Sequence, residues 1–145
     1  MANIDLNTNL GLIELILKLK LLKNTTFHIP KVLSTGVLNT VVGQTATHIE
    51  VANLGSTATR TVRVQVINWN SGSPVVLSNQ TLTLPPKTHQ IITTNVAPFH
   101  YEVRIAHPGD PNVIANTFAI NAATFTLPGL TFNQDELMVI EEGLL

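Results

Sequence analysis

The sequence predicts an all-β protein: a jelly-roll-like antiparallel sandwich of about 8 strands with an extended N-terminal arm. Composition is the first reason, because 19 Thr, 14 Asn, eight Gly and eight Pro stand among 145 residues. Thr suits a pleated, half-buried surface, whereas Asn, Gly and Pro suit the turns between strands. Spacing is the second reason, since short alternating runs are separated by turn signals about every 8–12 residues. A chain of this length fits one domain, which we place at residues 32–145 behind an arm at residues 1–31.

The alternating runs define the expected strands. They lie near residues 36–42, 45–53, 60–69, 74–83, 88–95, 100–107, 112–120, 122–127 and 136–141. The clearest run, at 60–69, predicts one inward and one outward face: Val62, Val64 and Val66 inward, and Thr61, Arg63 and Gln65 outward. Gly72 supplies the positive φ of the turn that follows. The Pro128-Gly129 pair marks a further boundary, because proline is kept out of strand ladders.

Residues 10–22 are the most apolar stretch of the sequence and need burial somewhere. On a strand, the odd positions form an unbroken apolar face opposite the charged side chains: Ile13, Leu15, Leu17, Leu19 and Leu21 against Glu14, Lys18 and Lys20. On a helix, Lys20 falls among the leucines, so periodicity favours a strand. The helix propensity of Leu, Lys and Glu favours the opposite assignment. We expect a strand, either donated to another subunit or paired within its own sheet.

The two ends of the chain carry opposite charge. Four of the five lysines lie in the first 31 residues, and four of the nine acidic residues lie in the last 11. If copies of the chain meet head to tail, the basic arm of one faces the acidic end of another: Lys18, Lys20 and Lys23 against acids such as Glu141 and Glu142. Solvated termini would produce the same pattern.

Several classes of function are disfavoured by what the sequence lacks. Without cysteine there is no disulfide framework, thiolate nucleophile or cysteine-bound metal. The eight basic and nine acidic side chains give no basic footprint for nucleic acid. Neither a Gly-x-Ser-x-Gly elbow nor a phosphate-binding Gly-rich loop occurs, so we expect no enzyme activity and no cofactor. The N-terminal residues show neither a secretory signal nor a membrane span.

Histidines and aromatic residues are the remaining candidates for chemistry. Two His/Glu pairs stand two residues apart, hence on one face of a strand, and two more histidines are candidate ligands: His48 with Glu50, His100 with Glu102, His89 and His107. A metal-binding cupin-type barrel would show His-x-His, which is absent, so we expect no metal site. Three aromatic residues could stack on a sugar, although core or rim positions suit them better: Trp69, Phe99 and Tyr101.

A Thr/Asn-rich jelly-roll body behind an extended apolar arm resembles the endospore appendage (Ena) pilins of spore-forming bacilli. The arm carries the resemblance together with three stretches of the body: Val-Gln-Val-Ile-Asn-Trp, Leu-Thr-Leu-Pro-Pro and Tyr-Glu-Val-Arg-Ile. The resemblance implies a fibre on the spore surface, in which each arm docks into the next subunit and neighbours extend one another's sheets. It does not imply disulfide cross-links, because the connector cysteines of the better-known Ena subunits have no counterpart here.

The arm and the resemblance together predict a structural subunit of a self-assembling extracellular or spore-surface fibre, polymerising by donor-strand insertion and β-augmentation. The expected interface combines apolar side chains inserted into a neighbour's groove with charged groups of both ends: Ile13, Leu15, Leu17, Leu19, Leu21, Lys18, Lys20, Lys23, Glu141 and Glu142. The expected partners are other copies of the chain and an anchor or tip protein of the spore surface (exosporium or appendage), where the fibre is assembled without a signal peptide. The alternative is a jelly-roll carbohydrate- or receptor-binding module that forms a closed oligomer such as a trimer.

Overall fold

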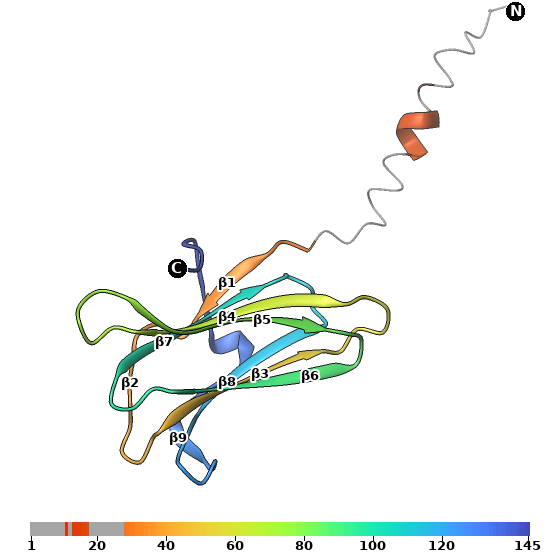
Figure 1. Ribbon diagram of the computed structural model, residues 1–145. Coiled ribbons are helices and arrows are strands. Elements are labelled where there is room, and N and C mark those ends of the chain that lie inside the picture. The colour runs from red at the N-terminus through yellow and green to blue at the C-terminus, as the bar shows by residue number, and fades with distance from the viewer. Residues whose placement is uncertain (1–10, 12, 18–27) are drawn as a thin grey trace, which may run out of the picture.

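The computed structural model describes residue 11, residues 13–17 and residues 28–145. Residues 28–145 form two antiparallel sheets packed face to face as a sandwich, which confirms the predicted all-β class (Figure 1). The six-stranded sheet has the order β10-β1-β7-β4-β5, with β2 also paired to β7: β10 (Met138–Ile140), β1 (Lys31–Ser34), β7 (His100–His107), β4 (Arg60–Asn68), β5 (Val75–Leu84) and β2 (Leu38–Asn39). The four-stranded sheet has the order β6-β3-β8-β9: β6 (Thr88–Asn95), β3 (Ala46–Asn53), β8 (Val113–Ile120) and β9 (Thr126–Phe132). A 3-10 turn at Gln134–Glu136 precedes β10.

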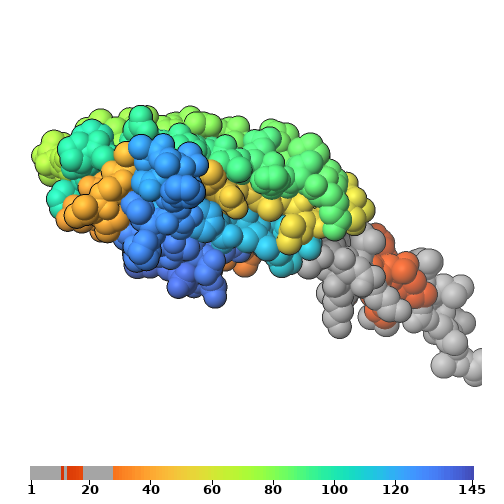
Figure 2. All heavy atoms as spheres, turned by 90° about the horizontal axis from the view of Figure 1, so that it is seen from below, coloured from red at the N-terminus to blue at the C-terminus, as the bar shows by residue number. Residues whose placement is uncertain are grey.

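The chain passes repeatedly from one sheet to the other, which is how the sandwich is closed. Only β1 and β2, β4 and β5, and β8 and β9 are consecutive strands of the same sheet. Seen from below, the four-stranded sheet shows green β6, yellow β3 and cyan to blue β8 as neighbouring bands (Figure 2). The pairing of β3 with both β6 and β8 joins segments that are far apart in the sequence.

The core lies between the sheets and consists of the inward positions that alternation predicts. Val62, Val64 and Val66 of β4 are buried, which confirms the predicted inward face of that strand. Ile49 and Val51 of β3 belong to the same apolar cluster, so both sheets contribute to it. Burying each such side chain contributes about 1.5–3 kcal/mol, and this cluster is therefore the main source of stability.

The predicted strands agree closely with the structure from β3 to β8 and differ at both ends of the sandwich. In place of one strand at 36–42, β1 and β2 flank a bend in which Gly36 has a φ of 67°. In place of a strand that ends before Pro128, β9 runs through Pro128 and Gly129. β9 is an edge strand, where a proline costs no bond to a further strand, so the predicted boundary there is wrong.

The hairpin between β4 and β5 follows the prediction. Gly72 has a φ of 77°, a conformation that glycine adopts without strain. Its N–H donates to the carbonyl oxygen of Trp69 at 3.1 Å and closes the turn.

Candidate assembly surface

Residues 11 and 13–17 of the arm are helical, so the strand expected over residues 10–22 is wrong for these residues. A strand needs a partner strand, and none of the strand pairings of the described chain includes these residues. The helix propensity of Leu and Glu therefore determines their conformation. Ile13, Leu15 and Leu17 are 54%, 55% and 61% exposed. The other predicted arm contacts lie outside the described residues: Leu19, Leu21, Lys18, Lys20 and Lys23.

No helix within the described ranges is long and apolar enough to cross a membrane.

An apolar groove lies open on the outer face of the six-stranded sheet, beside the root of the arm. Val32 of β1 pairs with Ile140 of β10 and with Ala106 of β7, and directly paired residues share a face of the sheet. Leu33 and Ile105, which follow Val32 and precede Ala106 in the chain, are buried in the core. The side chains of Val32, Ala106 and Ile140 therefore point outward. This root groove has a volume of about 770 Å³, and its apolar lining includes Ile29, Pro30, Val32, Ala106, Val139 and Ile140.

The neighbouring half of the same face is polar. The next row of the sheet places Arg104 between Ser34 of β1 and Gln65 of β4. Glu102 Oε1 accepts hydrogen bonds from Ser34 Oγ at 2.5 Å and Arg104 Nε at 2.9 Å, and Oε2 accepts one from Trp69 Nε1 at 3.0 Å. Burial raises the pKa of Glu102, but the hydrogen bonds outweigh it and hold the pKa below its usual range. Glu102 is therefore a buried, fully engaged carboxylate.

Residues 141–145, the C-terminal strap, cover this polar half. Arg104 Nη1 donates to the carbonyl oxygen of Gly143 at 3.2 Å. Gln65 Nε2 donates to the carbonyl oxygen of Leu145 at 2.8 Å, and Gln65 Oε1 accepts from the Leu145 N–H at 2.9 Å. Gln65 lies on the outer face, as predicted, but the strap buries it completely. On the outer face of β10, β1 and β7, a covered polar area thus adjoins an open apolar groove.

Glu141 and Glu142, the predicted acidic interface residues, are exposed where the two halves meet. Glu141 lines the root groove and also a smaller pocket over Glu102 and Arg104, and Glu142 lines that smaller pocket. The structure therefore places an acidic side chain at the apolar groove. The pairing of these acids with lysines of the arm stays a prediction, because those lysines lie outside the described residues.

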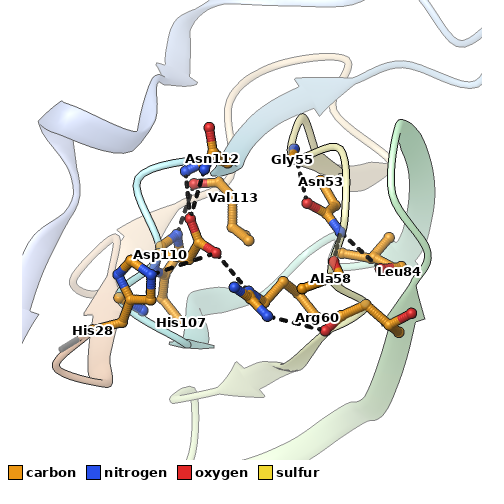
Figure 3. A network of polar contacts seen from close by, with 12 residues as sticks. His28, Asn53, Gly55, Ala58, Arg60, Leu84, His107, Asp110, Asn112 and Val113 are labelled. Carbon is orange, nitrogen blue, oxygen red and sulfur yellow. Dashed lines mark hydrogen bonds and ion pairs between the residues drawn. The ribbon is translucent and has the colours of Figure 1, made fainter. Parts of the chain in front are cut away.

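The root of the arm is held by a polar network at the end of β7 (Figure 3). Asp110 Oδ2 accepts a hydrogen bond from Arg60 Nε at 2.5 Å and lies 3.8 Å from His28 Nε2. Asp110 Oδ1 accepts from the N–H of Asn112 at 2.8 Å. The Asn112 N–H is the largest influence on the pKa of Asp110, and together with Arg60 it lowers that pKa against the opposing effect of burial. Asp110 thus connects β4, the loop after β7 and the arm.

Of the histidines considered as candidate metal ligands, His48 and His107 have other partners. His48 Nε2 lies 3.6 Å from Glu50 Oε1 on the outer face of the four-stranded sheet. Glu102 is engaged by Ser34, Arg104 and Trp69, and His107 is buried and bonded to backbone groups. Within the described residues, no three His, Asp or Glu side chains are close enough together to hold a metal ion.

The three aromatic candidates for sugar stacking do not form an exposed platform. Tyr101 is buried in the core, where its hydroxyl oxygen accepts a hydrogen bond from Gln44 Nε2 at 2.9 Å. Burial raises the pKa of Tyr101 above its usual range. Trp69 is half-buried with its indole N–H bound to Glu102, and Phe99 is also half-buried.

The chain matches no model of a known protein family and no curated protein. Its function is therefore argued from the geometry of its own surface. Sequence reasoning missed the root groove, the strap and the network at Asp110, because each is built from segments that are distant in the chain. The Pro108-Gly109-Asp110-Pro111 stretch has the composition of a turn, but this composition does not indicate what the turn contacts.

Proposed function

We propose that this chain is a structural subunit that assembles with copies of itself into a fibre, the arm of one copy docking at the root groove of the next. One observation carries the proposal: the same chain has exposed apolar side chains on its arm and an open apolar groove on its sandwich. Ile13, Leu15 and Leu17 gain nothing from exposure to water, and Val32, Ala106 and Ile140 offer a surface of the same character.

The position of the arm root favours docking between copies over docking within one chain. Ile29 and Pro30 line the root groove, so the arm starts at its wall. The backbone of Ile29 is also packed tightly against Gly109. An arm that entered its own groove would have to reverse direction at this packed wall, whereas the arm of another copy meets no such constraint. A head-to-tail contact of this kind generates a filament when it does not close into a ring.

Donor-strand pairing is the proposed mode of docking. β10 pairs only with β1 among the described strands, so its other edge offers backbone N–H and C=O groups to an added strand. An arm strand on this edge would direct its odd-numbered apolar side chains toward the groove: Ile13, Leu15, Leu17, Leu19 and Leu21. A helix whose apolar side chains are exposed lacks the packing that stabilises most helices. Its conversion into a strand would therefore cost little free energy.

The free energies of burial and association explain why this contact would need support from other contacts in a polymer. Burying one Leu or Ile side chain contributes about 1.5–3 kcal/mol, whereas association costs about 4–15 kcal/mol in lost freedom. A few buried arm residues therefore give a weak contact alone and need the added strand bonds and further contacts between neighbours. Attraction between arm lysines and Glu141 at the groove would help to fix the register of the arm strand and would speed association.

The resemblance to endospore appendage pilins adds a proposed location, the spore surface, and an anchor or tip protein as a further partner. A fibre without cysteine would owe its durability to slow dissociation of inserted strands. The alternative, a glycan-binding module, has less support, because Tyr101 is buried and the indole N–H of Trp69 is bound to Glu102.

Electron microscopy in negative stain tests the proposal. We expect filaments from the full chain and discrete particles from a chain that lacks residues 1–24. Leu17→Asp places a charge on the arm and should abolish filaments. Val42→Asp places the same charge at a fully exposed loop position and should leave them intact. Discrete particles from the full chain, or equal filament yields from the two aspartate variants, would overturn the proposal.

A further inference from the structure

The loop that follows β7 touches the arm root backbone to backbone. Gly109 has a φ of 78°, and a Cβ placed on it would lie 2.1 Å from the carbonyl oxygen of Ile29 and 2.6 Å from its carbonyl carbon. Real Cβ atoms do not approach backbone atoms so closely, so only glycine fits without displacing the arm root. The loop and the residue before Pro30 are therefore fitted to each other.

The loop is itself held rigidly by His107. The imidazole Nδ1 accepts a hydrogen bond from the Gly109 N–H at 2.9 Å, and Nε2 lies 2.9 Å from the carbonyl oxygen of Val113. A neutral imidazole with its proton on Nε2 satisfies both contacts. Burial lowers the pKa of His107, which favours this neutral form. The ring thus bridges the two ends of the loop and fixes its shape.

One carboxylate links this rigid loop to the arm. Asp110 is 3% exposed, and its two oxygens contact three parts of the chain: Asn112 within the loop, Arg60 on β4 and His28 on the arm (Figure 3). The contact with Arg60 fastens the loop to the six-stranded sheet. The contact with His28 reaches outside the sandwich, to a residue that precedes β1. The sandwich does not need this second contact in order to close.

We propose that the loop at residues 108–112 is a clamp that sets the direction in which the arm leaves the sandwich, with Asp110 and His28 as its positioning residues. The proposal rests on the proposed function only in that the arm is what links neighbouring copies. If the arm leaves the sandwich in one fixed direction, the angle between neighbouring copies is the same throughout the fibre. The fibre then has a single helical repeat. A loosened clamp would leave docking chemistry unchanged and make that angle variable.

The clamp is charge-dependent. The His28–Asp110 contact is an ion pair only when His28 is protonated. The other charged or titratable groups of this region are Arg60 on β4, which shares Asp110 Oδ2 with His28, Lys31 on β1 and His107 on β7.

Distances between two spin labels test the clamp without requiring a fibre. The chain has no cysteine, so Thr26→Cys and Ser71→Cys provide the only two label sites, one beside the arm root and one in the β4–β5 turn. Labelled chain is diluted into unlabelled chain, so that only distances within one copy are measured. We expect one narrow distance peak from the chain with His28 in place.

Variants of His28 separate charge from general structure. His28→Ala should lose the narrow peak. His28→Lys keeps a positive group beside Asp110 and should retain the narrow peak. His89→Ala removes an exposed histidine from β6 and should behave like the unchanged chain. A narrow peak that survives in His28→Ala, or is lost in His28→Lys, overturns the proposal.

The two proposals fail in different ways. If the full chain forms no filaments, the proposed function fails and the distance measurement still decides whether the clamp exists. If filaments form and the clamp exists, His28→Ala should retain polymerisation but lose the single helical repeat of the filaments. Filaments of His28→Ala with an unchanged, uniform repeat would show that the clamp does not set the angle between copies.

Discussion

Gln65 of β4 binds the backbone of Leu145 through both ends of its side-chain amide, with hydrogen bonds of 2.8 and 2.9 Å. The side chain therefore presents to the C-terminal strap the donor and acceptor that a neighbouring strand would present. Gln65 is fully buried under the strap although it lies on the outer face of the sheet. A polar position on the outer face thus becomes an attachment point for the end of the described chain.

Replacing Gln65 should detach the strap. Gln65→Leu removes both hydrogen bonds to Leu145, and a typical hydrogen bond contributes about 0.5–1.5 kcal/mol, so we expect a loss of about 1–3 kcal/mol in the free energy of unfolding. Urea denaturation measures the loss, and hydrogen exchange at the Leu145 amide should accelerate. Gln80→Leu, at an exposed position of β5, is the matched control. Equal stability of the two variants would contradict the role of Gln65.

Two glycines with positive φ provide a test of the contact at the arm root. Gly43 has a φ of 84° with open space around its Cβ position, whereas a Cβ on Gly109 meets the backbone of Ile29. Gly43→Ala should cost about 1 kcal/mol, the usual strain of a left-handed alanine. Gly109→Ala should cost about 1–3 kcal/mol more, which is typical of overpacking. Thermal unfolding of the two variants measures the difference, and equal midpoints would show that the arm root is not packed against the loop.

Stability should fall in two stages as the pH is lowered. The pKa of His107 is lowered from its ordinary 6.5, so the folded state binds fewer protons than the unfolded state below that pH. The stability that neutral His107 contributes is therefore complete above pH 6.5 and is lost as the pH falls toward the lower pKa of the folded state. The pKa values of Glu102 and Asp110 are lowered from 4.5 and 3.8, so a second loss begins below those values.

Urea denaturation at a series of pH values from neutral to acidic measures both stages. His107→Gln keeps a polar side chain but does not titrate, so it should remove the first stage and leave the second. A first stage that persists in this variant would assign the titration to another group.

Filling the root groove should prevent assembly without unfolding the sandwich. Ala106→Trp places a large side chain on the groove floor, between Val32 and the next strand. We expect loss of filaments by electron microscopy with unchanged circular dichroism. Ala123→Trp adds the same bulk at an exposed turn position after β8 and should leave filaments intact. Normal filaments from Ala106→Trp would exclude the root groove as the docking surface.

Much of the sandwich is predictable because its signal is local. Alternation in β4 gave the buried face of Val62, Val64 and Val66, and Gly72 marked the following turn. The signal was weaker for β9, since Pro128 is allowed only because β9 lies at an edge of the sheet. Edge position is a property of the assembled sheet, so a single run of sequence does not contain it.

The candidate site was predictable only in part. The apolar character of the arm was evident from Ile13, Leu15 and Leu17, but its conformation was not, because period and propensity favoured different structures. The helix found there shows that propensity decides when a strand has no partner. Glu141 was identified by its charge, while its place at the root groove follows from the pairing of β10 with β1.

The sequence by itself determined the all-β class, most strand positions, and an arm of apolar and basic residues ahead of an acidic end. These properties depend on side-chain alternation and composition, which act within a few residues. Only the tertiary structure decided that the C-terminal strap covers Gln65 beside an open apolar groove, and that Asp110 holds the root of the arm. Both features join residues brought together by strand pairing and sheet packing, and such long-range contacts are set by the whole chain.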